Sequence, residues 1–97
     1  MGETKIILTE PALEDLEEIE INISKYSVKI GRNLILKFFD KFELLASFPE
    51  MGYVVPEYNN NSIREIFQSK YRIIYLVTNQ RVEILRVIHG SKLIDTK

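Results

Sequence analysis

The sequence predicts an α+β fold in which a two-helix hairpin packs on one face of a four-stranded, mostly antiparallel sheet. Two segments in the first half carry apolar residues at helical spacing, and three segments in the second half are rich in Ile, Val, Tyr and Phe. Very few residues separate the two helical segments, so the helices must run antiparallel. The 97 residues are expected to form a single domain, 1–97, in the order strand, helix, helix, strand, strand, strand.

The first strand is expected at residues 5–9 and the first helix directly after it. Three adjacent apolar residues, 6–8, indicate a short strand that is buried on both faces. Thr9 is a plausible N-cap, and Pro11 falls in the first turn, where its missing N–H costs nothing. Apolar residues then recur at helical spacing at Leu13, Leu16, Ile19, Ile23 and Tyr26. This spacing predicts a helix of about four turns with an acidic outer face.

The second helix is expected to begin after Ser27 and to end at Phe48. Ser27 is a good N-cap, and Pro49 disfavours the helical conformation in the residue before it. The apolar stripe of this helix consists of Ile30, Leu34, Ile35, Phe38, Phe42 and Leu45, and basic residues occupy the other face. Gly31 is a poor helix residue, so we expect it to permit a close crossing of the two helices.

A loop at residues 49–62, rich in Pro, Gly and Asn, separates the helices from three predicted strands. The strands are expected at Ile63–Gln68, Tyr71–Val77 and Val82–His89, with a tight turn at 78–81. The middle strand carries bulky side chains on both faces, so each face needs a cover. The helices cover one face. Either a partner chain, or the loop together with the C-terminal tail, covers the other.

Composition excludes several classes of protein. The longest apolar run, residues 73–77, is far shorter than the ~20 residues of a membrane span, and no basic lead precedes an apolar stretch at the N-terminus. The absence of cysteine excludes a disulfide scaffold, a zinc finger and a thiol nucleophile, and it suits a cytoplasmic location. A single histidine excludes a multi-histidine metal site. No glycine-rich phosphate loop, no nucleophile elbow and no metal-ligand spacing occurs, so neither a cofactor nor a metal is expected.

Charge is unevenly distributed along the chain, although the formal net charge is −1. Residues 1–63 hold six basic side chains against eleven acidic ones, whereas residues 64–97 hold seven basic against three acidic. A basic C-terminal third suggests an anionic partner, either a phosphate backbone or an acidic protein segment. The alternative is an ordinary solvated strand surface.

Arg64, Arg72 and Arg86 lie inside predicted strands, where each must reach water, a carboxylate or a ligand. Arg86 is expected to share a face with the apolar residues at 82, 84 and 88. For this arginine the sequence favours an ion pair with a carboxylate of the first helix. Arg72 is expected to reach outward, next to the strand junction at 69–70. A guanidinium group suits phosphate and carboxylate equally, so neither arginine identifies the partner.

His89 ends the last predicted strand, with Lys92 close in sequence. A histidine beside basic groups at the edge of a sheet could move protons during phosphodiester cleavage, with arginines stabilising the phosphorus oxygens. The alternative is a structural histidine that caps the strand end through a backbone hydrogen bond. Together, Arg64, Arg72 and Lys92 are expected on the uncovered face of the sheet, which would then serve for docking onto another macromolecule.

Several strings, in this order and spacing, resemble the RelE/ParE superfamily of type II toxin–antitoxin toxins. They are ILTEPALEDL at 7–16, FPEMG at 48–52, VPE at 55–57, REI at 64–66, YRIIY at 71–75 and ILRVIHG at 84–90. The resemblance covers nearly the whole chain, and the loop FPEMG is closest to the ParE branch. It implies a small cytoplasmic toxin that a cognate antitoxin neutralises, commonly by wrapping an extended or helical segment around the toxin.

The resemblance also implies candidate site residues. RelE-like members cleave messenger RNA on the ribosome without metal, whereas ParE-like members inhibit DNA gyrase by binding. Arg72 matches the arginine of the RelE Tyr-Arg strand motif, Arg64 roughly matches a basic residue of the preceding strand, and Lys92 approximates the basic residue after the final glycine. His89 lies where a nuclease would need a proton carrier. The C-terminal catalytic tyrosine of RelE has no counterpart in residues 91–97.

Three hypotheses therefore stand. The first is a ParE-like toxin that binds gyrase and blocks DNA replication, which the FPEMG loop and the incomplete set of nuclease residues favour. The second is a RelE-like endoribonuclease that acts through Arg72, Arg64, His89 and Lys92 on ribosome-bound messenger RNA. The third is an inactive family member that acts only as an interaction domain. All three predict a hetero-oligomer with an antitoxin and no contact with a membrane.

Overall fold

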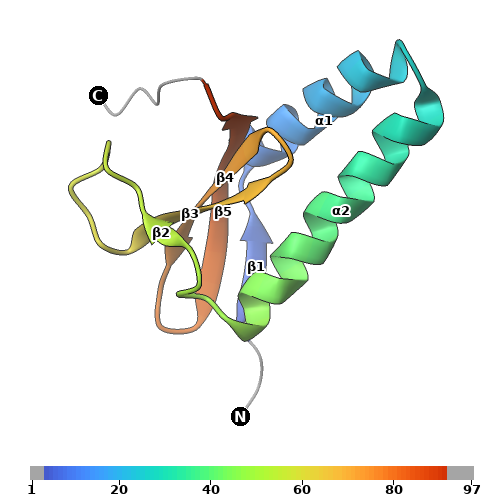
Figure 1. Cartoon of the computed structure of the whole chain (residues 1–97). Coiled ribbons are helices and arrows are strands. Elements are labelled where there is room, and N and C mark those ends of the chain that lie inside the picture. Colours follow the sequence, from blue (N-terminus) through green and yellow to red (C-terminus); the bar gives the residue numbers. More distant parts are fainter. Residues whose placement is uncertain (1–3, 92–97) are drawn as a thin grey trace.

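Two helices lie against one face of a five-stranded sheet in the computed structural model, which describes residues 4–91 (Figure 1). The elements are β1 (Lys5–Leu8), α1 (Glu10–Ser24), α2 (Val28–Ser47), β2 (Tyr53–Val54), β3 (Ile63–Gln68), β4 (Tyr71–Val77) and β5 (Arg81–His89). The strand order is β1-β5-β4-β3-β2, with β1 parallel to β5 and the other pairs antiparallel. The predicted fold class is thus confirmed. Neither helix has the length and apolar character of a membrane span.

The extra strand, β2, falls inside the segment predicted as a loop. It pairs with β3 through only two residues, Tyr53 opposite Glu65 and Val54 opposite Arg64. Two residues are too few to show the alternation by which a strand is recognised, and Gly52 and Pro56 flank them closely. The sheet therefore has five strands where the sequence predicted four.

The boundaries of both helices follow from their capping side chains, as predicted. The Thr9 hydroxyl accepts the N–H of Ala12 (3.4 Å) and donates to the carbonyl of Ile84 (2.6 Å), so it caps α1 and fastens the helix to β5. The Ser27 hydroxyl accepts the N–H of Ile30 (3.2 Å) at the start of α2. At the other end of α2, Phe48 donates its N–H to Leu44 before the chain turns at Pro49.

Gly31 brings the two helices together, as expected. A Cβ atom at this position would lie 2.6 Å from the hydroxyl oxygen of Ser24 and 3.3 Å from the carbonyl oxygen of Glu20. A side chain here would displace the Ser24 hydroxyl and crowd the backbone of α1, so glycine allows α2 to cross α1 this closely without such a shift.

The main core lies between the helices and the sheet. Its fully buried members include Ala12, Phe38, Leu45, Ile73, Tyr75, Val82 and Ile84. These side chains come from both helices and from the two central strands, so the core joins all the principal elements.

The opposite face of β4 is covered by the chain itself. Val55, Ile74 and Ile88 form a second buried cluster, against which Tyr58 and Ile63 pack. Val55 and Tyr58 belong to the segment between β2 and β3. The sequence left open whether a partner chain, or the loop together with the C-terminal tail, covers this face. The segment between β2 and β3 provides cover here, and the tail from residue 92 lies outside the described residues.

A β-bulge in β5 changes which face its residues occupy. Ile74 pairs with Arg86 and the next residue, Tyr75, pairs with Ile84, so one residue of β5 is passed over. Val82 and Ile84 consequently lie in the core under the helices, whereas Ile88 belongs to the cluster on the other face. The expectation that Arg86 shares one face with residues 82, 84 and 88 was wrong, because strict alternation along the strand does not survive the extra residue.

We expect Tyr75→Phe to lower the free energy of unfolding by about 1–3 kcal/mol, because it leaves a buried backbone donor unpaired. The Tyr75 hydroxyl is the acceptor for the N–H of Gly52 (2.9 Å), and the tyrosine is fully buried. Urea denaturation measures the effect. Tyr26→Phe is the matched control, since Tyr26 is 91% exposed and its substitution should change stability little. Equal stability of the two variants would contradict the assignment.

The same tyrosine gives the protein a pH dependence at alkaline pH. Burial raises the pKa of Tyr75 above the ordinary value of about 10. The folded state then keeps a proton that the unfolded state has lost, so the free energy of unfolding falls as pH rises from about 10 through the folded-state pKa. We expect the free energy of unfolding, measured by urea denaturation, to fall more steeply with pH in the native protein than in Tyr75→Phe. Parallel pH profiles would contradict it.

Candidate interaction site

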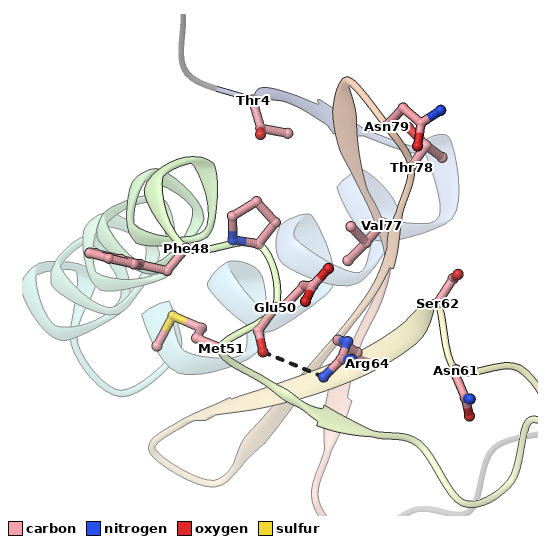
Figure 2. A pocket seen from close by; sticks show the side chains of 11 residues that line it. Thr4, Phe48, Glu50, Met51, Asn61, Ser62, Arg64, Val77, Thr78 and Asn79 are labelled. Carbon is pink, nitrogen blue, oxygen red and sulfur yellow. Dashed lines mark hydrogen bonds between the residues drawn. The ribbon is translucent and has the colours of Figure 1, made fainter. Parts of the chain in front are cut away.

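A cleft of 790 Å³ opens where α2 ends, beside the turn between β4 and β5 (Figure 2). We call it the loop cleft. Its lining residues come from four separate segments and are Thr4, Phe48, Pro49, Glu50, Met51, Asn61, Ser62, Arg64, Val77, Thr78 and Asn79. The first four residues of the string FPEMG, which the sequence analysis singled out, thus form one wall of this cleft.

Arg64 holds that wall in place. Its Nη1 donates to the carbonyl oxygen of Gly52 (2.9 Å). A longer hydrogen bond joins the same nitrogen to the carbonyl oxygen of Glu50 (3.4 Å), which the dashed line in Figure 2 marks. Gly52 also donates its N–H to the hydroxyl of Tyr75. An added Cβ on Gly52 would lie 2.5 Å from both that hydroxyl and the carbonyl oxygen of Glu65. Glycine is therefore required for the loop to approach the sheet this closely.

Apolar side chains in the loop cleft face solvent. Phe48 is 60% exposed and Met51 is 43% exposed, and both project from the same wall (Figure 2). Large apolar side chains that stay exposed beside a polar rim are typical of protein–protein contact sites. The polar rim here consists of Glu50, Arg64 and the amide side chains of Asn61 and Asn79. The loop cleft is therefore suited to bind another protein.

Arg72, which was expected to reach outward, is instead buried. Its Nε donates to Glu65 (2.5 Å), and Nη1 and Nη2 donate to the two carboxylate oxygens of Glu57 (3.1 and 3.2 Å). Only 6% of the residue is exposed. The hydrogen bonds to Glu57 are the largest cause that raises the pKa of Arg72 above its ordinary value, followed by those to Glu65, while burial opposes them.

The partners of Arg72 differ in how well the sequence could have indicated them. Gln68 pairs with Tyr71 across a two-residue turn, which places Glu65 and Arg72 on one face of the hairpin and near each other. That pairing could have been read from the sequence. Glu57 arrives from the segment between β2 and β3, and no local pattern indicates its approach.

Arg64 and Arg72 lie on opposite faces of the sheet. Arg64 is the cross-strand partner of Tyr75, whose side chain lies in the core under the helices. Arg72 follows the alternation of Ile74, which lies in the cluster on the other face. The predicted positively charged face shared by these two arginines was therefore wrong. Lys92, the third residue expected there, lies outside the described residues.

Arg86 forms the ion pair with the first helix that the sequence favoured. Its Nε and Nη2 donate to the two carboxylate oxygens of Asp15 (2.7 and 3.0 Å). Asp15 also accepts the N–H of Val87 (2.9 Å), so it covers the part of β5 that β1 leaves unpaired. The hydrogen bonds to Asp15 are the largest cause that raises the pKa of Arg86. This arginine therefore has a structural role.

His89 lies at the end of the sheet remote from the loop cleft. It pairs with Tyr71, and the two rings meet edge to face at 5.9 Å. Its Nδ1 is 2.8 Å from the hydroxyl of Ser91 and accepts the N–H of Ser91 (3.2 Å), which agrees with the capping alternative. The structure thus separates three of the predicted site residues, namely Arg64, Arg72 and His89. Within residues 4–91 no cluster of potential metal ligands occurs.

Comparison with known proteins gives a family and a fold. Residues 6–94 match the family described as ParE toxin of type II toxin–antitoxin system, parDE. A solved structure, the chromosomal ParDE toxin–antitoxin system from P. aeruginosa, superposes with a TM-score of 0.73 at 15% sequence identity. The similarity covers 89% of this chain and 95% of that chain. No curated protein matches the sequence.

We expect Arg72→Met to lower the free energy of unfolding by about 3–5 kcal/mol, because it leaves two partly or fully buried carboxylates without their cation. Chemical denaturation followed by circular dichroism measures the loss. Arg81→Met is the matched control, since Arg81 pairs with Glu83 on the surface and such pairs contribute about 0–1 kcal/mol. A loss at Arg72 no larger than that at Arg81 would show that the buried cluster does not hold the fold together.

Proposed function

Since the chain belongs to the ParE toxin family of type II toxin–antitoxin systems, we propose that it arrests cell growth by binding and inhibiting DNA gyrase. A cognate antitoxin binds the toxin and neutralises it. The observation that carries this proposal, in preference to RNA cleavage, is the engagement of Arg72 by Glu57 and Glu65.

Cleavage of a phosphodiester requires a proton carrier and cations around one phosphate. Arg72 has its guanidinium group between two carboxylates, and Arg64 bonds the loop on the other face of the sheet. His89 lies near the Tyr71 end of β4, whereas the loop cleft includes Val77 at the opposite end of that strand. The described residues therefore favour a toxin that acts by binding.

The loop cleft is the surface we assign to the target. Phe48 and Met51 supply apolar contact area, and Arg64 keeps their loop fixed against the sheet before any partner arrives. A contact surface that is already ordered loses less conformational entropy on binding. The resemblance of this loop to the ParE branch points to the same target.

Two assays with the purified protein and with induced cells test the proposal. We expect stoichiometric toxin to inhibit supercoiling by gyrase, and we expect addition of the product of the adjacent open reading frame to restore it. Transcripts mapped after induction should stay intact while growth stops. Cleaved transcripts together with unaffected supercoiling would replace the proposal with a ribonuclease, and harmless overexpression would indicate an inactive family member.

We expect the double substitution Phe48→Ser/Met51→Ser to weaken inhibition of gyrase about ten-fold or more, since each buried apolar side chain contributes over 1 kcal/mol at an interface centre. The concentration that halves supercoiling measures the effect. Ile21→Ser/Leu36→Ser is the matched control, because these residues are 55% and 57% exposed on the two helices, away from the cleft. Equal inhibition by both double variants would remove the loop cleft from the proposal.

A further inference from the structure

Arg64 differs from the other arginines of the sheet in having no carboxylate partner. The others all form ion pairs within the chain; they are Arg72, Arg81 and Arg86. Arg64 donates instead to two backbone carbonyls, which carry no formal charge. Within residues 4–91, no acidic side chain therefore lies at ion-pair distance from this guanidinium group.

The hydrogen bonds of Arg64 leave one edge of its guanidinium group available. Both bonds to the loop come from Nη1, so the N–H groups of Nε and Nη2 have no partner among the described residues. In Arg86 the same two nitrogens bind the two carboxylate oxygens of Asp15, at 2.7 and 3.0 Å. The available edge of Arg64 is therefore the edge that binds a carboxylate through two parallel hydrogen bonds.

Arg64 lies in the loop cleft together with exposed apolar side chains. Phe48 and Met51 line the same cleft and are exposed to solvent (Figure 2). Asn61 and Asn79 add amide groups that can form hydrogen bonds with the backbone of a bound segment. The loop cleft thus offers a single partner one cation, apolar contact area and uncharged hydrogen-bonding groups.

We propose that Arg64 binds a carboxylate of gyrase, and that the loop cleft recognises an acidic segment in which an apolar side chain lies next to this carboxylate. The apolar side chain contacts Phe48 and Met51. The inference rests on the proposed function, because gyrase is the target named there, and it adds the chemistry of the segment that the cleft binds.

A phosphate of a nucleic acid is the other anion that the edge of Arg64 would fit. Binding to a phosphate backbone depends on several cations along one surface. Among the described residues, the lining of the loop cleft holds one basic side chain, Arg64, and one acidic side chain, Glu50. A single cation beside a carboxylate and exposed apolar side chains therefore favours an acidic protein segment over a nucleic acid.

The first test removes the cation. In Arg64→Gln the target's carboxylate loses its partner, while the amide keeps a hydrogen-bond donor on this side chain. We expect the toxin concentration that halves supercoiling by gyrase to rise about ten-fold or more. Arg32→Gln is the matched control, because it removes the same charge at an exposed position of α2 outside the cleft. It should change this concentration less than two-fold.

The second test removes the negative charge of the cleft and should act in the opposite direction. Without the carboxylate of Glu50, an acidic segment should bind about two- to five-fold more tightly at low salt. Glu43→Gln is the matched control on the exposed side of α2. If Arg64 only holds the loop in place, Glu50→Gln will leave inhibition unchanged. Glu50 is exposed, so this variant tests the inference even if urea denaturation shows that Arg64→Gln is unfolded.

Binding of each variant to DNA-free gyrase and to a 20-base-pair DNA duplex is measured in parallel. Weaker binding of Arg64→Gln to gyrase, with tighter binding of Glu50→Gln, supports the inference. If Arg64→Gln loses only duplex binding, the arginine contacts phosphate and the inference is wrong. If native toxin inhibits gyrase and both variants behave like their controls, the inference fails and the proposed function stands. If native toxin neither binds nor inhibits gyrase, both fail.

Discussion

The guanidinium group of Arg72 fixes the loop between β2 and β3 against the sheet. It joins a carboxylate of the same hairpin, Glu65, to one that arrives with the loop, Glu57. Val55 and Tyr58 belong to the same loop and cover the face of β4 that the helices leave open. Without the ion pairs, only the small apolar cluster would bind the loop to the sheet, and the carboxylates of Glu57 and Glu65 would lie beside it without their cation.

This arrangement also limits what the toxin can do chemically. A buried ion pair adds little net stability compared with a well-packed apolar cluster, so its value lies in fixing one arrangement of the chain. Here it fixes the loop, and it occupies the guanidinium group that the ribonuclease hypothesis assigned to phosphate. Arg86 is engaged by Asp15 in the same way. Arg72 and Arg86 thus serve the fold, and the exposed apolar surface of the loop cleft remains for a partner.

Local chemistry allowed most of the fold to be predicted from the sequence. Thr9, Ser27 and Pro49 define the helix ends through hydrogen bonds and steric restrictions within a few residues, and the apolar periodicities identify the long strands. The errors arise where contacts between segments distant in the sequence determine the local structure. β2 exists only because β3 lies beside it, and the bulge in β5 appears only when the strand pairs with β4. Arg72 was misplaced because its decisive partner, Glu57, comes from a loop whose path has no sequence signature.

The loop cleft owes its form to two constraints that meet at the end of α2. Pro49 ends the helix, and the loop that follows is bound through Gly52, whose carbonyl accepts from Arg64 and whose N–H donates to Tyr75. The loop thus approaches the sheet through backbone groups, and the side chains of Phe48 and Met51 stay exposed beside it. Apolar side chains on a backbone that is already fixed lose less conformational entropy when they are covered, which suits this wall to binding.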